Sequence, residues 1–175
     1  IDAMIMLHRE PSALSTAQNG GANCSLLRPL RIFSMPWLFP STRFASTSVV
    51  MAMGDDHTGE SSTTLHQSDW AMVDAYMPIV SPAGVQEILD YGIYAWALSR
   101  YAGVWVGLKT MKDTIEVTSV VESDAVAREF VIPDLELPDE GLNIRLVDTP
   151  VAQEARMIDY KRFAAEAFSR ANKMD

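Results

Sequence analysis

The sequence lacks the residues on which several kinds of protein depend. It has one cysteine, Cys24, in 175 residues, which excludes an internal disulfide, a cysteine-rich zinc site and an iron–sulfur cluster held by this chain. Basic residues are scarce, with 14 Lys and Arg against 23 Asp and Glu, so no nucleic-acid-binding or membrane-binding surface is expected. No run approaches the roughly 20 apolar residues of a membrane-spanning helix. Because 48% of the residues are hydrophobic, we expect a soluble, cytoplasmic domain with a substantial core.

The charge is distributed unevenly along the chain. Residues 1–50 carry four basic and two acidic side chains, whereas residues 51–175 carry ten basic and 21 acidic ones. The composition changes near Thr47, and the part before it is rich in Ser, Ala, Pro and Leu with scattered Arg. Such a stretch is compositionally similar to an organelle transit peptide, but it also fits an irregular or wrongly bounded leader. We therefore predict a leader of unclear origin over 1–47 and a folded domain over 48–175.

Strand and helix signals alternate after residue 47. The apolar run before Gly54 predicts a buried strand, Ser81 with Pro82 predicts a helix start, and Gly103 predicts that helix's end. This pattern predicts a three-layer α/β fold, a parallel sheet flanked by helices. The expected strands are 48–53, 78–80 and 104–108, with further β candidates at 115–121 and 130–132; the expected helices run from 68 or 69 to 75, from 81 to 103 and from 149 to about 172, and 133–141 is a solvated connection.

The loop from Gly54 to Asp69 is where chemistry is expected. Two acids, two imidazoles and a run of hydroxyls follow an apolar strand directly. In an open parallel sheet, ligands bind beyond the carboxyl ends of the strands, which is where this loop begins. The same residues would also serve simply to cap backbone N–H groups in a turn, and this alternative stays open.

Two specific chemistries can be weighed for this loop. Residues 54–61 nearly match the phosphate-binding pattern G-x-x-x-x-G-K-[ST], but Glu60 stands at the lysine position and would repel the phosphates. Carboxylate and imidazole together suit a divalent metal, so a small metal hydrolase is a further hypothesis. Its ligands would be Asp55, Asp56, His57 and His66. Adjacent carboxylates point in different directions, which weakens this hypothesis.

A series of motifs carries a family resemblance over residues 49–175. In order along the chain they are GDDH at 54–57, SST at 61–63, HQS at 66–68, VQE at 85–87, WALSRY at 96–101, DTIE at 113–116, GLNIR at 141–145, DTP at 148–150, QEAR at 153–156 and ANK at 171–173. In composition, order and spacing this region resembles the fused indolepyruvate ferredoxin oxidoreductases, which are thiamine-diphosphate-dependent 2-oxoacid:ferredoxin oxidoreductases.

The resemblance implies a thiamine-diphosphate-binding fold, of which this chain is an incomplete pyrimidine-binding domain. Such enzymes oxidatively decarboxylate a 2-oxoacid, here indolepyruvate or another arylpyruvate, to acyl-coenzyme A, with ferredoxin as electron acceptor. Thiamine diphosphate with Mg would be shared with other domains of the same enzyme, and the iron–sulfur clusters would lie only in those domains. The full-length enzyme is expected to be a homo-oligomer.

The family's loop lies at the cofactor and substrate cleft, which gives the candidate residues here. The resemblance makes His57 and His66 the catalytic candidates, able to bind the substrate carboxylate. Separately, the helical Arg100 is a candidate for an anionic group, with a helix-dipole role as the alternative. The further cleft candidates are Asp55, Asp56, Ser61, Ser62, Thr63 and Gln67.

The sequence also departs from the family. Glu60 and Leu65 stand where members often have Lys and Pro, and residues 1–48 contain no Asn-Glu-Asp stretch with the glutamate that activates the aminopyrimidine. We therefore expect the isolated chain to be inactive. The rival hypothesis is a non-catalytic remnant or interaction module with the same α/β fold.

Overall fold

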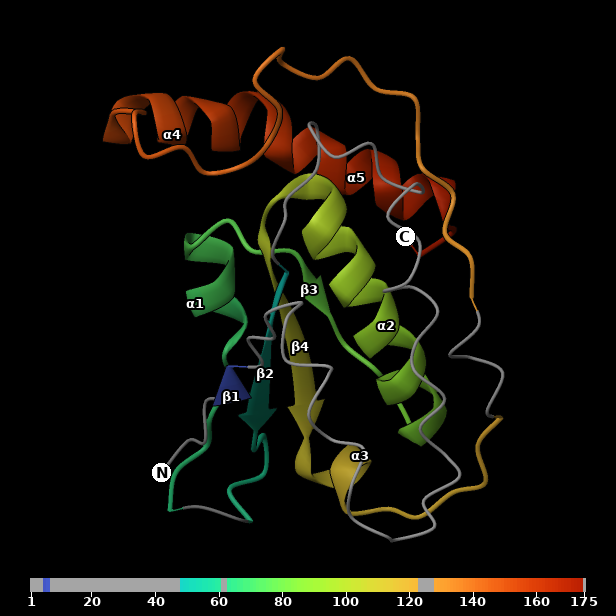
Figure 1. Cartoon of the computed structure of the whole chain (residues 1–175). Helices are drawn as coiled ribbons and strands as arrows, with labels where there is room; N and C mark the ends of the chain where they lie inside the picture. The colour runs from blue at the N-terminus through green and yellow to red at the C-terminus, as the bar shows by residue number, and fades with distance from the viewer. Residues whose placement is uncertain (1–4, 7–47, 61–62, 123–127, 175) are drawn as a thin grey trace, which may run out of the picture.

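A four-stranded sheet in the order β1-β2-β4-β3 organises the computed structural model of the chain, which describes residues 5–6, 48–60, 63–122 and 128–174 (Figure 1). Strands β2, β4 and β3 are parallel, and β1 is antiparallel to β2. The longest pairing joins β2 to β4, from Val49 opposite Trp105 to Asp55 opposite Met111. The strands are β1 (Ile5–Met6), β2 (Val49–Asp55), β3 (Ile79–Val80) and β4 (Trp105–Met111).

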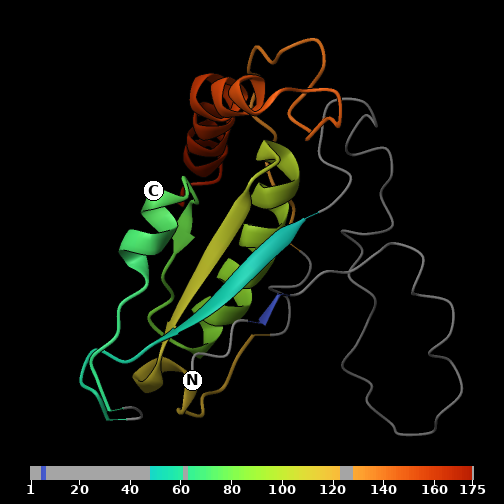
Figure 2. The ribbon, with the colours of Figure 1, turned by 90° about the vertical axis from the view of Figure 1, so that its left-hand side faces the viewer.

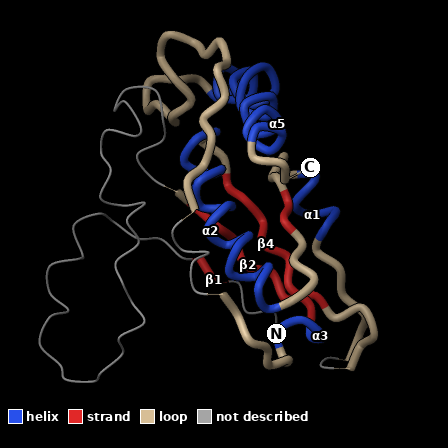
Figure 3. The backbone as a smooth tube through the Cα atoms, turned by 90° about the vertical axis from the view of Figure 1, so that its right-hand side faces the viewer, coloured by secondary structure: helices blue, strands red, loops and turns tan. Residues whose placement is uncertain are grey.

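Helices cover both faces of this sheet, as Figures 2 and 3 show from opposite sides. The long α2 lies on one face, and the short α1 lies on the other, where Met72 packs so closely on Gly107 that a Cβ there would collide with its sulfur. The predicted α/β class is therefore confirmed. The helices are α1 (Asp69–Asp74), α2 (Val85–Ala102), α3 (Lys112–Ile115), α4 (Pro150–Arg156), a π-helical turn η4 (Met157–Lys161) and α5 (Arg162–Ala171).

The core lies between the sheet, α2 and α5. Val50 and Val106 are opposite one another in the register, and both are buried in the cluster that also contains α2 residues. The ring of Phe168 on α5 stacks on Tyr101 at 5.2 Å between centroids and lies 5.7 Å from Tyr94. The second half of α2 is buried, as its nearly uniform apolarity predicts.

The ends of the helices follow sequence signals only in part. Helix α2 ends at Gly103 in the left-handed conformation, φ +66°, as predicted. It begins later than predicted, at Val85 with Gly84 as N-cap, so Ser81 and Pro82 precede the helix. The last helix starts as predicted, because the Thr149 hydroxyl accepts a hydrogen bond from the backbone N–H of Ala152.

The two further β candidates are wrong. Residues 112–115 form α3, and neither 116–121 nor 130–132 forms a strand. β4 is already paired on both sides, by β2 and β3, so these segments meet no open edge there. Val120 is 98% exposed, which shows that the β-branched residues of this segment have no layer to pack against.

Two further predictions concern the leader and membrane-spanning helices. Most of the predicted leader, 1–47, falls outside the described residues; Ile5 and Met6 pair with Ala52 and Met51. Within the described part of the chain, no helix has the length and apolarity needed to cross a membrane.

Substitution of Gly103 by alanine is expected to lower the free energy of unfolding by about 2 kcal/mol or more. A side chain there would be strained at φ +66°, and its Cβ would lie 2.6 Å from the carbonyl oxygen of Leu142. The matched control is Gly92→Ala in the same helix, where a Cβ meets nothing within 4 Å, so stability should rise by up to about 1 kcal/mol. Chemical denaturation followed by circular dichroism measures the free energy of unfolding of both variants. Equal effects would contradict the requirement for glycine at position 103.

Candidate functional site

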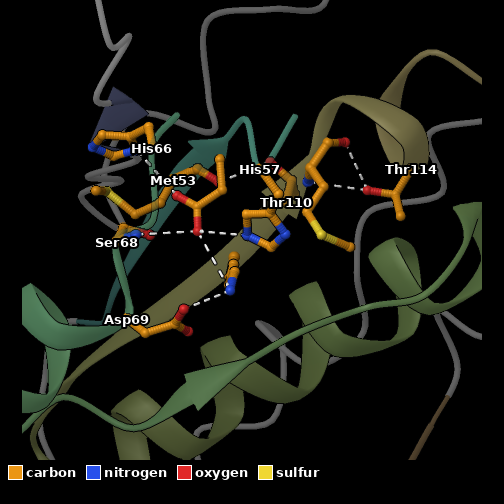
Figure 4. A network of polar contacts seen from close by, with 10 residues as sticks. Met53, His57, His66, Ser68, Asp69, Thr110 and Thr114 are labelled. Carbon is orange, nitrogen blue, oxygen red and sulfur yellow. Dashed lines mark hydrogen bonds and ion pairs between the residues drawn. The ribbon is translucent and has the colours of Figure 1, made fainter. Parts of the chain in front are cut away.

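The candidate site lies at the carboxyl end of β2, where the chain enters the loop that the sequence singles out. Asp55 is the last residue of β2 and only 2% exposed. In parallel sheets this edge is where ligand crevices form. The neighbouring strand β4 contributes Lys109 and the start of α1 contributes Asp69, so three elements meet around one carboxylate (Figure 4).

Lys109 bridges the two carboxylates. Its Nζ lies 3.4 Å from Oδ2 of Asp55 and 2.6 Å from Oδ2 of Asp69. The backbone N–H of Ser68 donates to the same Asp55 oxygen at 3.1 Å. Because a buried charge is costly unless it is paired, these contacts are what allow an ionised Asp55 at this position.

Two partly exposed histidines flank the buried carboxylate of Asp55. His57 Nε2 lies 3.7 Å from Oδ2, and His66 Nδ1 lies 3.4 Å from Oδ1. Their side chains are 34% and 37% exposed, whereas that of Asp55 is fully buried. Figure 4 shows the two rings on different sides of the central carboxylate. The imidazoles thus form a rim between a buried anion and the solvent.

The loop is closed by Asp56, whose role differs from that of its neighbour. Its backbone pairs with His66 through hydrogen bonds of 3.3 and 3.0 Å, which bring the two ends of the loop together. The Asp56 carboxylate accepts from the backbone N–H of Glu60 at 3.1 Å and so holds the turn. Asp55 and Asp56 therefore have different surroundings. The alternative role considered from the sequence, capping backbone N–H groups in a turn, applies to Asp56.

The contacts shift two pKa values. Burial on its own raises the pKa of Asp55, but the Ser68 hydroxyl and backbone N–H and the Lys109 ammonium outweigh it, so the pKa lies below its usual value. The hydrogen bond to Asp69, together with the charges of both carboxylates, raises the pKa of Lys109 against its own burial. The contacts therefore favour the ionised carboxylate of Asp55 and the charged ammonium of Lys109.

The structure brings only some of the predicted site residues together. Asp55, His57 and His66 converge, whereas Thr63 and Gln67 are exposed, and Ser61 and Ser62 lie outside the described residues.

Arg100 lies at the opposite end of the strands, near the amino ends of β2 and β4. It is in the last turn of α2, where the neighbouring Ser99 hydroxyl contacts the backbone N–H of Val49 at 2.9 Å and the carbonyl of Val104 at 2.6 Å. These two residues mark the amino ends of β2 and β4. Arg100 is therefore not part of the Asp55 cluster, and its candidate role in binding an anionic group stays a prediction.

Sequence reasoning missed Lys109 and Asp69. The signal for Lys109 was present, since it is a single charged residue in an otherwise apolar or small run of β4. A charge in a buried strand requires a partner, and the nearest acid after the neighbouring strand is Asp55. Asp69, expected only at the start of a short helix, pairs through its side chain with Lys109.

The proposed metal ligands do not form a metal-binding group. Among the described residues, no three His, Cys, Asp or Glu side chains are placed to hold a metal ion. Asp55 faces the histidines and Lys109, while Asp56 faces the turn. The ammonium beside Asp55 would also compete with any cation. The geometry gives the metal-hydrolase hypothesis no support.

Replacing Lys109 by methionine is expected to destabilise the chain by about 3 kcal/mol, because Asp55 would keep a buried charge without its cation. The matched control is Lys112→Met. Lys112 also pairs with an acid at 2.6 Å, but its partner Glu60 is 57% exposed, so the loss should be much smaller. Urea denaturation of the two variants compares them, and equal losses would show that the Lys109 bridge has no special weight.

Asp55→Asn should destabilise the chain in a pH-dependent manner. A carboxyl whose pKa is lowered by folding stabilises the native state above its unfolded pKa of about 3.9, and this contribution is lost as the pH falls through the folded pKa. The difference between wild type and Asp55→Asn should therefore be largest near pH 7, about 1–3 kcal/mol, and shrink below about pH 4. A pH-independent difference in denaturation curves would refute this.

Comparison of the chain with protein-family models, with curated proteins and with solved structures finds no match in any of the three.

Proposed function

We propose that this chain is part of a thiamine-diphosphate-dependent 2-oxoacid:ferredoxin oxidoreductase acting on indolepyruvate or a similar arylpyruvate, and that the Asp55 loop contributes to the substrate cleft. One observation carries the proposal. Two partly exposed imidazoles lie against a buried carboxylate at the carboxyl end of a parallel strand, in the loop that carries the family resemblance.

The described residues do not fit the Mg–diphosphate part of the cofactor. They include no group of metal-ligating side chains, and the Asp55 carboxylate is engaged by Lys109 and Ser68. Under this proposal other domains hold the diphosphate, and no step is assigned to it here. When bound, thiamine diphosphate supplies the electron sink for decarboxylation.

The role proposed for this chain is to bind and orient the substrate. Nε2 of His57 lies 3.7 Å from the Asp55 carboxylate, within ion-pair distance, and this leaves Nδ1 on the other side of the ring. Nδ1 of His66 lies 3.4 Å from Oδ1 of the same carboxylate. An imidazole held in this way can donate an N–H to the carboxylate of a 2-oxoacid, and the acceptor behind it strengthens that donor.

The arrangement of charges supports an orienting role for the buried Asp55. Lys109 lies between the carboxylates of Asp55 and Asp69, and the two partly exposed imidazoles lie beside the buried Asp55 carboxylate. A substrate carboxylate therefore meets imidazole donors and not the bare acid. In this proposal, His57 and His66 contact the substrate, and Asp55 positions the two histidines.

The test uses the complete enzyme that contains this chain, with 2-oxoacid-dependent ferredoxin reduction as the readout. His57→Gln places an amide N–H near the position of Nε2, so it keeps the contact to Asp55 and removes the outward nitrogen; His66→Asn does the same for Nδ1. Each should lower kcat/KM for the 2-oxoacid roughly ten- to hundredfold, mainly through KM, and leave thiamine diphosphate affinity unchanged.

The control is Asp139→Asn in the exposed connection 133–141, which should retain full activity. Unchanged kcat/KM in both histidine variants would remove them from the site. A wild-type enzyme that reduces no ferredoxin with any arylpyruvate or other 2-oxoacid would overturn the function itself.

A further inference from the structure

A pocket lies between the turn that follows α1 and helix α5, which are close together beside the sheet (Figure 2). Two of its lining residues mark the amino ends of strands, because Pro78 directly precedes β3 and Val104 directly precedes β4. Asp55, by contrast, is at the carboxyl end of β2. The pocket is therefore separate from the candidate site and lies toward the opposite end of the strands.

The walls of the pocket are mostly apolar. Its volume is about 340 Å³, near the lower end of the range of about 300–1,000 Å³ for ligand pockets, so only a small ligand fits. Apolar walls favour a hydrocarbon body, whose surface is removed from water on binding. The apolar lining residues are Val73, Tyr76, Met77, Pro78, Val104 and Ala165.

One wall is a strained turn that the backbone holds in place. Tyr76 has a φ of +54°, in the left-handed region that is unfavourable for a residue with a large side chain. Its N–H donates to the carbonyl of Val73, and the N–H of Met77 donates to the carbonyl of Met72, each at 3.0 Å. These bonds join the end of α1 to the start of β3 and fix the wall before any ligand arrives. Strained backbone of this kind is concentrated at functional sites such as ligand clamps.

Arg162 is the charged group that the pocket offers to a ligand. It is the first residue of α5, it is exposed, and its guanidinium lies 4.5 Å from the centre of the Phe163 ring. Within the described ranges of the chain, Arg162 forms no ion pair. Contact with a ring face leaves the N–H groups at the edge of the guanidinium available for an anion.

The other two polar lining residues already have partners. Glu166 pairs with Arg170, and the Ser169 hydroxyl shares a hydrogen bond of 2.6 Å with the hydroxyl of Tyr94. Glu166 is one helical turn from Arg162, so its carboxylate opposes a doubly charged anion such as a phosphate monoester. One guanidinium in apolar surroundings therefore suits a single carboxylate, which it can bind through two parallel N–H···O bonds.

We propose that this pocket binds a small monocarboxylic acid with a compact hydrocarbon body. The carboxylate contacts the guanidinium of Arg162, and the body packs against Tyr76, Val104 and the other apolar walls. This inference does not depend on the proposed enzymatic activity, because the pocket shares no lining residue with the Asp55 cluster.

The first test is isothermal titration calorimetry of the full chain with 3-phenylpropanoate, whose phenyl ring is the compact apolar body. One equivalent should bind, and 3-phenylpropanamide, which has the same body without the charge, should bind about tenfold more weakly or worse. Arg162→Gln should weaken binding of the acid by a similar factor and leave that of the amide unchanged. The matched control is Lys112→Gln, which removes a cation beyond the carboxyl end of β4 and should leave both affinities unchanged.

The second test fills the pocket. Val73 is 54% exposed, so Val73→Trp should fold, and its larger side chain should weaken binding of the acid by about tenfold or more. The control is Val120→Trp, because Val120 is 98% exposed and lies in the segment after α3, outside the pocket lining.

Several results would overturn the proposal. They are a wild type that binds no 3-phenylpropanoate at millimolar concentration, equal affinities for the acid and the amide, and an Arg162→Gln or Val73→Trp variant that binds the acid like the wild type. Loss of binding in His57→Gln with none in Arg162→Gln would place the acid at the Asp55 loop and would equally remove the pocket as its site.

Discussion

The buried ammonium of Lys109 is the constraint on which the arrangement of the site depends. It comes from the middle strand β4 and is shared by carboxylates from the end of β2 and the start of α1. A lysine at this depth is tolerated only if its charge is balanced locally, so the two acids cannot be placed independently of it. The strand register Met53 to Lys109 brings the ammonium beside the strand end, and the loop must close over it.

This one requirement also explains the surroundings of the cluster. Because the 56–66 backbone pairing returns the chain to Asp55, the two histidines lie on either side of the same carboxylate although nine positions separate them. The contact of Asp69 with Lys109 fixes the start of α1, and the next residue, Trp70, consequently points away from the sheet. The polar cluster and the exposed Trp70 are thus linked through adjacent residues at the start of α1.

Local sequence patterns predicted those helices and strands whose burial in the folded chain agrees with the pattern. The apolar runs of β2 and β4, the Gly103 helix end and the Thr149 cap could be identified because backbone sterics and capping are local properties. The valines after α3 could not be excluded as a strand, because only the tertiary structure shows that both edges of β4 are occupied. The loop was found as the site, but its central cation was not, since Lys109 and Asp55 meet only through strand pairing across 53 intervening residues.

The position of the site in the sheet explains why the proposed activity requires the rest of the enzyme. β2 has seven residues, and the strand described on its outer side, β1, pairs only with Met51 and Ala52. The Asp55 cluster therefore lies at the end of a strand whose outer edge is largely uncovered in the described structure. Parallel sheets are normally covered on both faces and extended on both sides, and their clefts are bounded by two neighbouring strand ends. Here β4 supplies one boundary through Lys109, and a strand or domain beyond β2 would supply the other. Under the proposed function, His57 and His66 beside Asp55 would be the part of the cleft wall that this chain provides.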